Sequence, residues 1–299
     1  MSELLNQPEA LRQLRLRGQQ LAEMIRLPLR NKIWRGGSGE FAGAGTGSSL
    51  EFQDHRAYMA GDDPRHINWQ AYARTGQYSM KVFREEVRPM VDLILDVSAS
   101  QFYDPVKATR VVELFQFCIS AANKAGASLH VSLINGPAFI PVGNDHLLTD
   151  AWAQRLPQHQ STSVASDPPA LDRLPLRAQA MRILISDLLY PGAPDHVLRP
   201  LSDRQGRGII FSPFCHAEAK VEWNGNYEFV DPESQTHHLR RVEPSLLKRY
   251  QEAYRRHCDL WKAASLRYGI LLARVEAELD FHRALQFEAQ VIGAVEIMA

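Results

Sequence analysis

The chain has 299 residues, of which 45% are hydrophobic and 23% charged, a composition typical of a globular protein. Its 34 basic and 34 acidic residues cancel, which argues against nucleic acid or an anionic lipid surface as a partner. Three cysteines far apart in the chain predict neither a disulfide framework nor a zinc site, and we expect a cytoplasmic protein with no signal peptide and no membrane span.

The first 88 residues predict an N-terminal helical and irregular extension. Apolar residues recur at helical spacing in residues 8–27, and an amphipathic helix of this kind usually packs on the body of a protein. Six glycines between Gly36 and Gly47 indicate a flexible loop. Residues 51–76 are dense in charged and aromatic residues without clear periodicity, whereas the alternation in residues 78–86 predicts a strand.

Residues 89–299 predict the main domain, because strand and helix patterns alternate there. Strands are expected at 90–97, 128–136, 138–142, 181–187, 208–214, 227–231 and 269–278, and helices from Asp104-Pro105 onward and at 147–156, 194–204, 244–268 and 280–298. This alternation predicts an α/β fold with a doubly wound, mostly parallel sheet covered by helices on both faces.

Polar residues follow two of the predicted buried strands. The run LILDVSAS places Asp96, Ser98 and Ser100 at the end of one strand, and MRILISD ends another strand with Asp187. Ligands of parallel sheets bind beyond the carboxyl ends of the strands, and oxygen ligands of this kind suit Mg²⁺. The alternative is a strand that simply ends in a polar turn.

The segment GDDPRHINWQAYAR, residues 61–74, has two possible roles. Arg65, Trp69 and Arg74 are residue types that often dominate protein interfaces, so the segment could bind a partner. The alternative is structural: a turn capped by one of the two aspartates, with Trp69 packed on the sheet and the arginines paired with a glutamate of strand 78–86. The turn-forming residues of the first half favour the structural alternative.

Several motifs resemble known families. DVSAS is similar to the DxSxS motif of the metal-ion-dependent adhesion site (MIDAS) in von Willebrand factor A-like domains. The residues before it resemble the signature of the bacterial DUF58 family, a domain of unknown function, and the resemblance continues to the C-terminus. The matching segments are EF at 51–52, RAY at 56–58, GDDPRHINW at 61–69 and AR at 73–74.

The resemblance implies a von Willebrand A-like fold and an Mg²⁺ or Mn²⁺ site. The ligands implied are Asp96, Ser98, Ser100 and Asp187, with a loop threonine for which Thr162 is the candidate. Family members are typically encoded beside MoxR-type AAA+ ATPases and are thought to act with them as adaptors, on client proteins that the sequence does not identify. Many members have two membrane helices, and this chain resembles the shorter, soluble branch.

Two functions follow from these residues. The first is a non-enzymatic, metal-dependent protein-binding module that serves as an adaptor or co-chaperone of a MoxR-type ATPase. The second is an Mg²⁺-dependent phosphotransferase or hydrolase that uses Asp96. Enzymes of that class place a second carboxylate two residues after the nucleophile, where this chain has Ser98, and no nucleophile elbow is present. The sequence therefore favours binding over catalysis.

Overall fold

The computed structural model describes residues 7–29, 50–59, 62–85, 88–154, 168–232 and 236–298. The chain divides into two compact units, a larger one of Met1–Asn31 with Pro89–Ala299 and a smaller one of Lys32–Arg88. The smaller unit ends at Arg88. The first 31 residues, however, belong with the larger unit, so the structure differs from the expected extension of residues 1–88.

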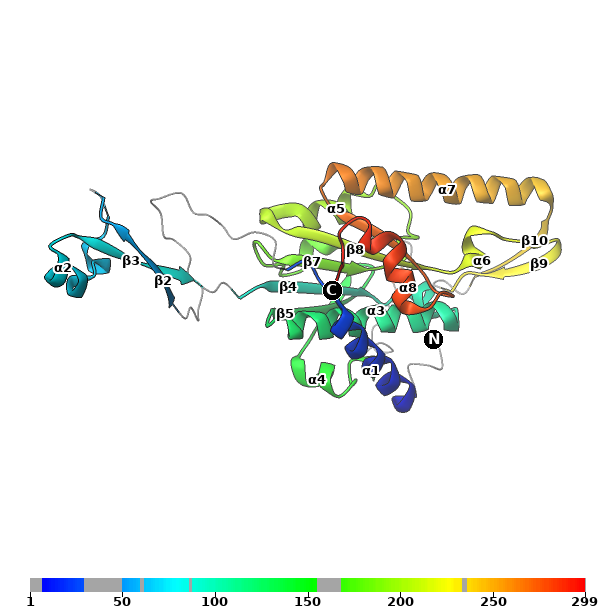
Figure 1. Ribbon diagram of the computed structural model, residues 1–299. Helices are drawn as coiled ribbons and strands as arrows, with labels where there is room; N and C mark the ends of the chain where they lie inside the picture. Colours follow the sequence, from blue (N-terminus) through cyan, green and yellow to red (C-terminus); the bar gives the residue numbers. More distant parts are fainter. Residues whose placement is uncertain are drawn as a thin grey trace. The chain divides into compact units, whose positions relative to one another are not determined.

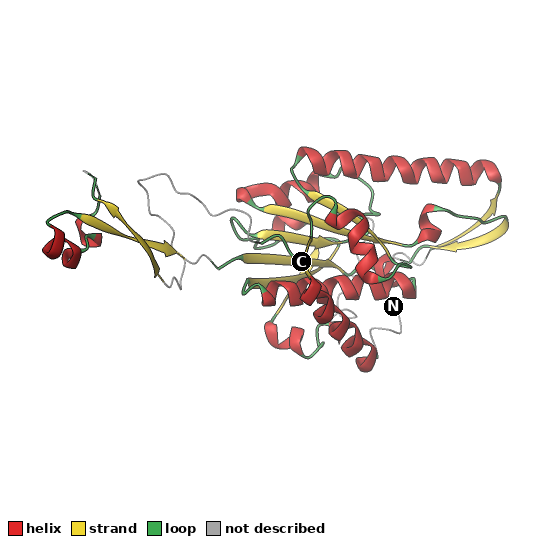
Figure 2. Ribbon diagram, in the orientation of Figure 1, coloured by secondary structure: helices red, strands yellow, loops and turns green. Residues whose placement is uncertain are grey.

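The larger unit is built on a six-stranded sheet of order β11-β8-β7-β4-β5-β6. Figure 2 shows strands of this sheet in yellow among the red helices of the unit. Neighbouring strands are parallel except for β6, which is antiparallel to β5. The strands are β4 (Met90–Asp96), β5 (Ser128–Asn135), β6 (Ala138–Val142), β7 (Met181–Ile185), β8 (Arg207–Phe214) and β11 (Leu271–Glu276). The predicted α/β architecture with a mostly parallel sheet is confirmed.

Helices cover both faces of this sheet (Figure 1). Leu93 and Leu95 of β4 point into the core shared with α1 and α3, whereas Ile94 between them points into a second core that includes Trp261 of α7. This alternation is the pleat of a strand that is buried on both sides. The helices are α1 (Pro8–Met24), α3 (Pro105–Lys124), α4 (Asn144–Leu148), α5 (Asp195–Ser202), α6 (His216–Ala219), α7 (Pro244–Arg267) and α8 (Phe281–Leu285).

Within the described residues, none of these helices combines the length and apolar character that a bilayer crossing requires. Even the two longest, α3 and α7, carry charged residues along their length.

Two predicted helices differ from the structure. The helix expected at 147–156 is α4, which begins earlier and ends at Leu148, shortly before Asp150 takes a left-handed conformation with φ 58°. The helix expected at 280–298 is α8, which continues into a π-helical segment, η7 (Gln286–Gln290), and ends before Gly293, whose φ is 77°. The chain then ends in β12 (Glu296–Ile297), which pairs with β1 (Ile25–Arg26).

A hairpin was also missed. β9 (Gly225–Val230) was expected in part, but its antiparallel partner β10 (His237–Val242) was not. The side chains of β10 are exposed except for Val242, so this strand lacks the regular apolar alternation by which strands are recognised.

The smaller unit contains a β-hairpin and a short helix. Its elements are β2 (Leu50–Ala57), the 3₁₀ helix η2 (Pro64–His66), α2 (Trp69–Thr75) and β3 (Ser79–Glu85). Strand β3 was predicted, but β2 was not. The register of the pairing between β2 and β3 shifts between Phe52 and Asp54, and such a shift interrupts the alternation of side chains along a strand. Helix α2 begins with a cap, since the side chain of Asn68 accepts a hydrogen bond from the Ala71 amide.

Helix α1 belongs to the larger unit because it packs closely on α3. Leu11, Leu14 and Leu21 are buried in the core on this side of the sheet. Gly18 lies at the closest approach, where a Cβ would be 2.8 Å from the backbone nitrogen of Phe117. No real Cβ tolerates such a contact with backbone, so this packing requires glycine.

We therefore expect Gly18→Ala to destabilise the protein, although alanine in place of glycine stabilises an exposed helix by about 1 kcal/mol. The clash with α3 should reverse the sign and lower the free energy of unfolding by about 1–3 kcal/mol. Urea unfolding measures the change. Gln19→Ala, at the exposed neighbouring position, is the control and should be nearly neutral. A more stable Gly18→Ala protein would contradict the observed packing.

Candidate metal centre

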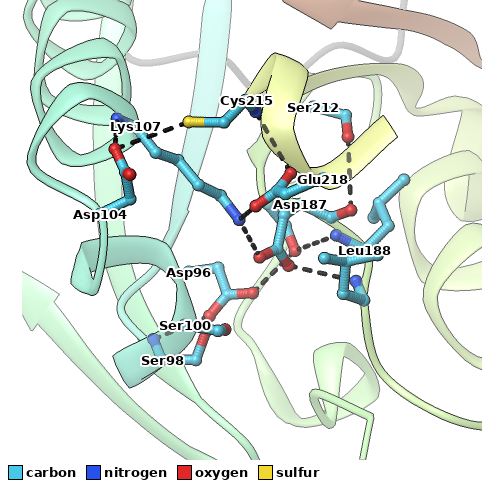
Figure 3. A network of polar contacts seen from close by, with 12 residues as sticks. Asp96, Ser98, Ser100, Asp104, Lys107, Asp187, Leu188, Ser212, Cys215 and Glu218 are labelled. Atoms are coloured by element: carbon cyan, nitrogen blue, oxygen red, sulfur yellow. Dashed lines mark hydrogen bonds and ion pairs between the residues drawn. The ribbon is translucent and has the colours of Figure 1, made fainter. Parts of the chain in front are cut away.

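The predicted site lies where β4 and β7 end side by side. Leu95 of β4 pairs in parallel with Ile185 of β7, which confirms the two apolar runs as neighbouring inner strands. Asp96 follows the first of these residues directly, and Ser186 and Asp187 follow the second. Figure 3 shows the side chains of Asp96 and Asp187 within one network of polar contacts. The topology therefore brings the predicted carboxylates to one edge of the sheet.

Asp96 is buried, with 4% of its surface exposed. Its Oδ1 accepts a hydrogen bond from the Ser98 amide at 3.0 Å, and its Oδ2 accepts one from the Ser186 hydroxyl at 2.7 Å. Both donors are neutral. Sequence reasoning missed Ser186, although a polar residue at the end of an apolar strand was a usable signal.

This environment is unfavourable for a charged carboxylate. Burial, and to a lesser degree the charge of Asp187, raises the pKa of Asp96 to about 6, in spite of the hydrogen bonds from Ser186 and Ser98. A buried carboxylate without a cationic partner is destabilised in its charged form, and such shifts are concentrated at functional sites. A cation near Asp96 would oppose this shift, because it would stabilise the charged form of the carboxylate.

The two serines of the motif lie beside this carboxylate. Ser98 precedes the 3₁₀ helix η3 (Ala99–Phe102), which contains Ser100, and the two hydroxyl oxygens are 3.3 Å apart. Both residues are partly exposed. Asp96, Ser98 and Ser100 are thus brought together as predicted, whereas Thr162 lies outside the described residues.

Asp187 has a cationic partner that the sequence did not reveal. Its Oδ2 is 2.6 Å from Lys107 Nζ, and its Oδ1 accepts a hydrogen bond from the Leu189 amide at 3.1 Å. The same ammonium group is 2.8 Å from Glu218 Oε1. These carboxylates are 80 and 111 residues from Lys107 in the sequence, so no local pattern indicated the contacts.

Lys107 is charged in spite of its burial. Desolvation alone would lower the pKa of its ammonium group, but the charges of Asp187 and Glu218 and their hydrogen bonds raise that pKa above its usual value. The ammonium group thus faces the carboxylates of Asp187 and Glu218, and the charge of Asp187 adds to the effect of burial on Asp96. The uncompensated charge is negative, which favours a further cation.

The donor set fits a hard divalent cation. Among the described residues, no group of three histidine, cysteine, aspartate or glutamate side chains could hold a metal ion. The oxygens at this site are instead mixed, with the carboxylate of Asp96 and the hydroxyls of Ser98 and Ser100. Oxygen ligands with few carboxylates suit Mg²⁺ or Mn²⁺, which keep several waters in the shell.

The predicted partner-binding residues belong to the smaller unit. Trp69 is 57% exposed, and its ring meets those of Tyr72 and Tyr78 edge to face within the smaller unit. Arg65 pairs with Asp63, whose side chain caps η2. Arg74 is exposed in the last turn of α2. The capped turn that the structural alternative expected is present.

Comparison with known proteins gives a family and two distant structures. A family model described as "Protein of unknown function DUF58" matches residues 54–259. Similar solved structures include the conserved hypothetical protein BatB from Bacteroides thetaiotaomicron (11% identity, TM-score 0.35) and an aerotolerance-related membrane protein from Bacteroides fragilis (14% identity, TM-score 0.32). Each covers 68% of this chain and 98% of the other. No curated protein matches the chain.

The shifted pKa of Asp96 predicts how stability depends on pH in a metal chelator. In the folded chain the carboxyl group of Asp96 stays protonated up to about pH 6. In the unfolded chain it loses its proton at about its ordinary pKa of 3.8. Because the folded state binds the proton more tightly, the free energy of unfolding should fall as pH rises from about 4 to about 6. The loss expected from Asp96 is about 1–3 kcal/mol.

Asp96→Asn should therefore stabilise the chelated protein at pH 7 and flatten its pH dependence in this window. Chemical unfolding at several pH values measures both effects. Asp172→Asn, which changes an exposed aspartate, is the matched control and should leave the pH profile of the wild type unchanged. A chelated Asp96→Asn protein that is less stable than wild type at pH 7 would show that the charge of Asp96 is well compensated.

Proposed function

The chain belongs to the DUF58 family, and we propose that it is a cytoplasmic, metal-dependent protein-binding module that acts as an adaptor of a MoxR-type AAA+ ATPase. The observation that carries the proposal is the buried carboxylate of Asp96, with only neutral donors on its oxygens, beside the hydroxyls of Ser98 and Ser100. We further propose that the larger unit has a von Willebrand A-like fold and that these residues form its metal-ion-dependent adhesion site.

The ligands determine what such a site can do. Asp96 supplies one negative charge, while Ser98 and Ser100 supply neutral oxygens. A divalent cation held mainly by these groups keeps part of its charge and can accept an acidic side chain of a partner protein. We propose that the partner contributes an aspartate or glutamate.

The surroundings of the ligands favour a protein as the partner. Tyr103, three residues after Ser100, is 68% exposed, and Leu189, two residues after Asp187, is 44% exposed. Large apolar side chains on the segments that carry the ligands are typical of a protein contact. They supply contact area around the acidic side chain that the site would accept.

A second contact is proposed for the smaller unit, because an adaptor must bind two proteins. Trp69 and Tyr78 are exposed aromatic residues in contact with each other, and the side chain of Arg65, four residues before Trp69, is almost fully exposed. Together with Arg74 they provide the aromatic and arginine side chains that contribute most to protein interfaces.

The enzymatic alternative would use Asp96 as a nucleophile and needs a cation to neutralise a phosphate. Lys107 supplies the ammonium group of the polar network around Asp187, and this group is already paired with the carboxylates of Asp187 and Glu218. The charge of Lys107 is therefore already compensated by the protein's own carboxylates and is not available to a substrate phosphate. We propose that the purified chain turns over neither phosphate nor ester substrates.

The proposal predicts that binding of the cognate MoxR-type ATPase requires Mg²⁺ or Mn²⁺. Asp96→Ala should abolish cation binding and most of the affinity for the ATPase, because it removes the only charged ligand expected to contact the ion directly. Ser98→Ala and Ser100→Ala should each weaken cation binding less, by about tenfold. Titration calorimetry, with cation and then with ATPase, measures both affinities.

Asp172→Ala is the matched control for the loss of a carboxylate, and thermal melts report folding. Undiminished binding of the ATPase by a folded Asp96→Ala protein in chelator would exclude the proposed role of the site. Phosphate or ester hydrolysis that Asp96→Asn abolishes would instead support the enzymatic alternative.

If the smaller unit makes a second contact, a substitution in this unit should weaken the binding of a partner protein without changing cation binding. Trp69→Ala should weaken binding of a partner by roughly tenfold or more and leave cation affinity unchanged, because Trp69 is part of the other compact unit. Gln70→Ala, at the exposed neighbouring position in α2, is the control. Unchanged affinity of Trp69→Ala for both the ATPase and its client would remove the smaller unit from the proposal.

A further inference from the structure

Lys107 is buried in the polar network that contains the candidate metal ligands. Its side chain is 2% exposed, and its ammonium group bridges Asp187 and Glu218 (Figure 3). A buried lysine is retained only where carboxylates compensate its charge. The bridge could be purely structural, since it joins α3, the end of β7 and α6. Because Lys107 lies next to the candidate metal site, its charge would also affect how a cation is bound there.

The two aspartates at the strand ends differ in their partners. Both oxygens of Asp187 have donors, one of them the Lys107 ammonium and the other the Leu189 amide. Among the described residues, the oxygens of Asp96 accept hydrogen bonds from neutral groups of Ser98 and Ser186 and have no ion-pair partner. A cation bound directly by Asp187 Oδ2 would lie close to the Lys107 ammonium group and compete with it for the charge of that carboxylate, whereas a cation bound by Asp96 meets no such competitor among the described residues.

We infer that Lys107 determines the specificity of the cation site. It retains Asp187 as an outer group that meets the cation through water, and it cancels part of the negative charge of the network. Both effects leave the cation with one direct carboxylate. Mg²⁺ tolerates such a shell because it keeps several waters, but Ca²⁺ takes six to eight oxygens and often a bidentate carboxylate. Lys107 thus selects Mg²⁺ over Ca²⁺ and leaves the ion available to a partner's acidic group.

This inference rests on the proposed metal site and can fail separately from it. Lys107→Met removes the ammonium group and keeps an unbranched apolar chain. It should strengthen cation binding by about 10- to 100-fold, because a unit charge close to the ion is lost in a medium of intermediate dielectric constant. The gain should be larger for Ca²⁺ than for Mg²⁺, because Asp187 becomes available as a direct ligand.

Glu218→Gln is the matched control. It breaks the same contact between Lys107 and Glu218 but removes a negative charge instead of a positive one. If Lys107 acts through its charge, the two variants should change the cation affinity in opposite directions. Glu218→Gln should bind cations more weakly than the wild type and keep the wild-type ratio of Ca²⁺ to Mg²⁺ affinity. If Lys107 served only to hold α3 and α6 together, both variants would weaken cation binding.

A second comparison does not require the lysine variant to fold. Asp96→Asn should abolish Mg²⁺ binding, whereas Asp187→Asn should weaken it much less, because Asp187 acts through water and its charge is already compensated. Equal losses in these two variants would make Asp187 a direct ligand and overturn the inference.

The experiment is calorimetric titration of the full, chelator-treated chain with MgCl₂, MnCl₂ and CaCl₂, with melting curves in chelator for each variant. Stronger binding by Lys107→Met with a shift toward Ca²⁺ supports the inference. Unchanged or weaker binding by a folded Lys107→Met protein, with wild-type binding intact, overturns it and leaves the proposed function standing. A wild-type chain that binds none of the three cations overturns both.

Discussion

The structure depends on a concentration of negative charge where two neighbouring strands end. Parallel strands bring their carboxyl ends to one edge of a sheet, so the aspartates that follow β4 and β7 share a network that is largely closed to water. Within the part of the chain that the structure describes, Asp187 has an ion-pair partner and Asp96 does not. A protein of marginal stability keeps an unfavourable carboxylate of this kind where it has a use.

The position of Lys107 follows from the way in which α3 begins. Asp104 caps the helix by accepting hydrogen bonds from the amides of Val106 and Lys107, and Pro105 fits the first turn. This cap fixes the third residue of the helix relative to the strand ends. Glu218 is fixed in a similar way, because its second carboxylate oxygen accepts the Cys215 amide at the start of α6. Two helix starts therefore hold the groups that surround Asp187.

The sequence predicted those features whose causes are local. The apolar runs of β4 and β7, the aspartates that follow them and the cap at Asp104 can each be recognised within about ten residues. The contact of Lys107 with Asp187, the hydrogen bond from Ser186 to Asp96 and the packing of α1 on α3 could not be predicted. Each depends on the pairing of distant segments, which leaves no periodicity in the chain. For the same reason, the first 31 residues were assigned to the wrong side of the domain boundary.

The segment GDDPRHINW, residues 61–69, contains residues with a structural role and a residue with a proposed functional role. Asp62 accepts hydrogen bonds from the Arg56 side chain and the Met59 amide. Asp63 caps η2, and Asn68 caps α2. These three residues are needed to form the turn, which explains their types without any partner. Trp69 has no comparable role, since its ring is exposed on the surface of its own unit. A large aromatic side chain that the local fold does not bury is more readily explained by a contact with another molecule. The most specific motif of the chain therefore builds a turn and presents a tryptophan, whereas the charge that would bind a cation lies in the other unit.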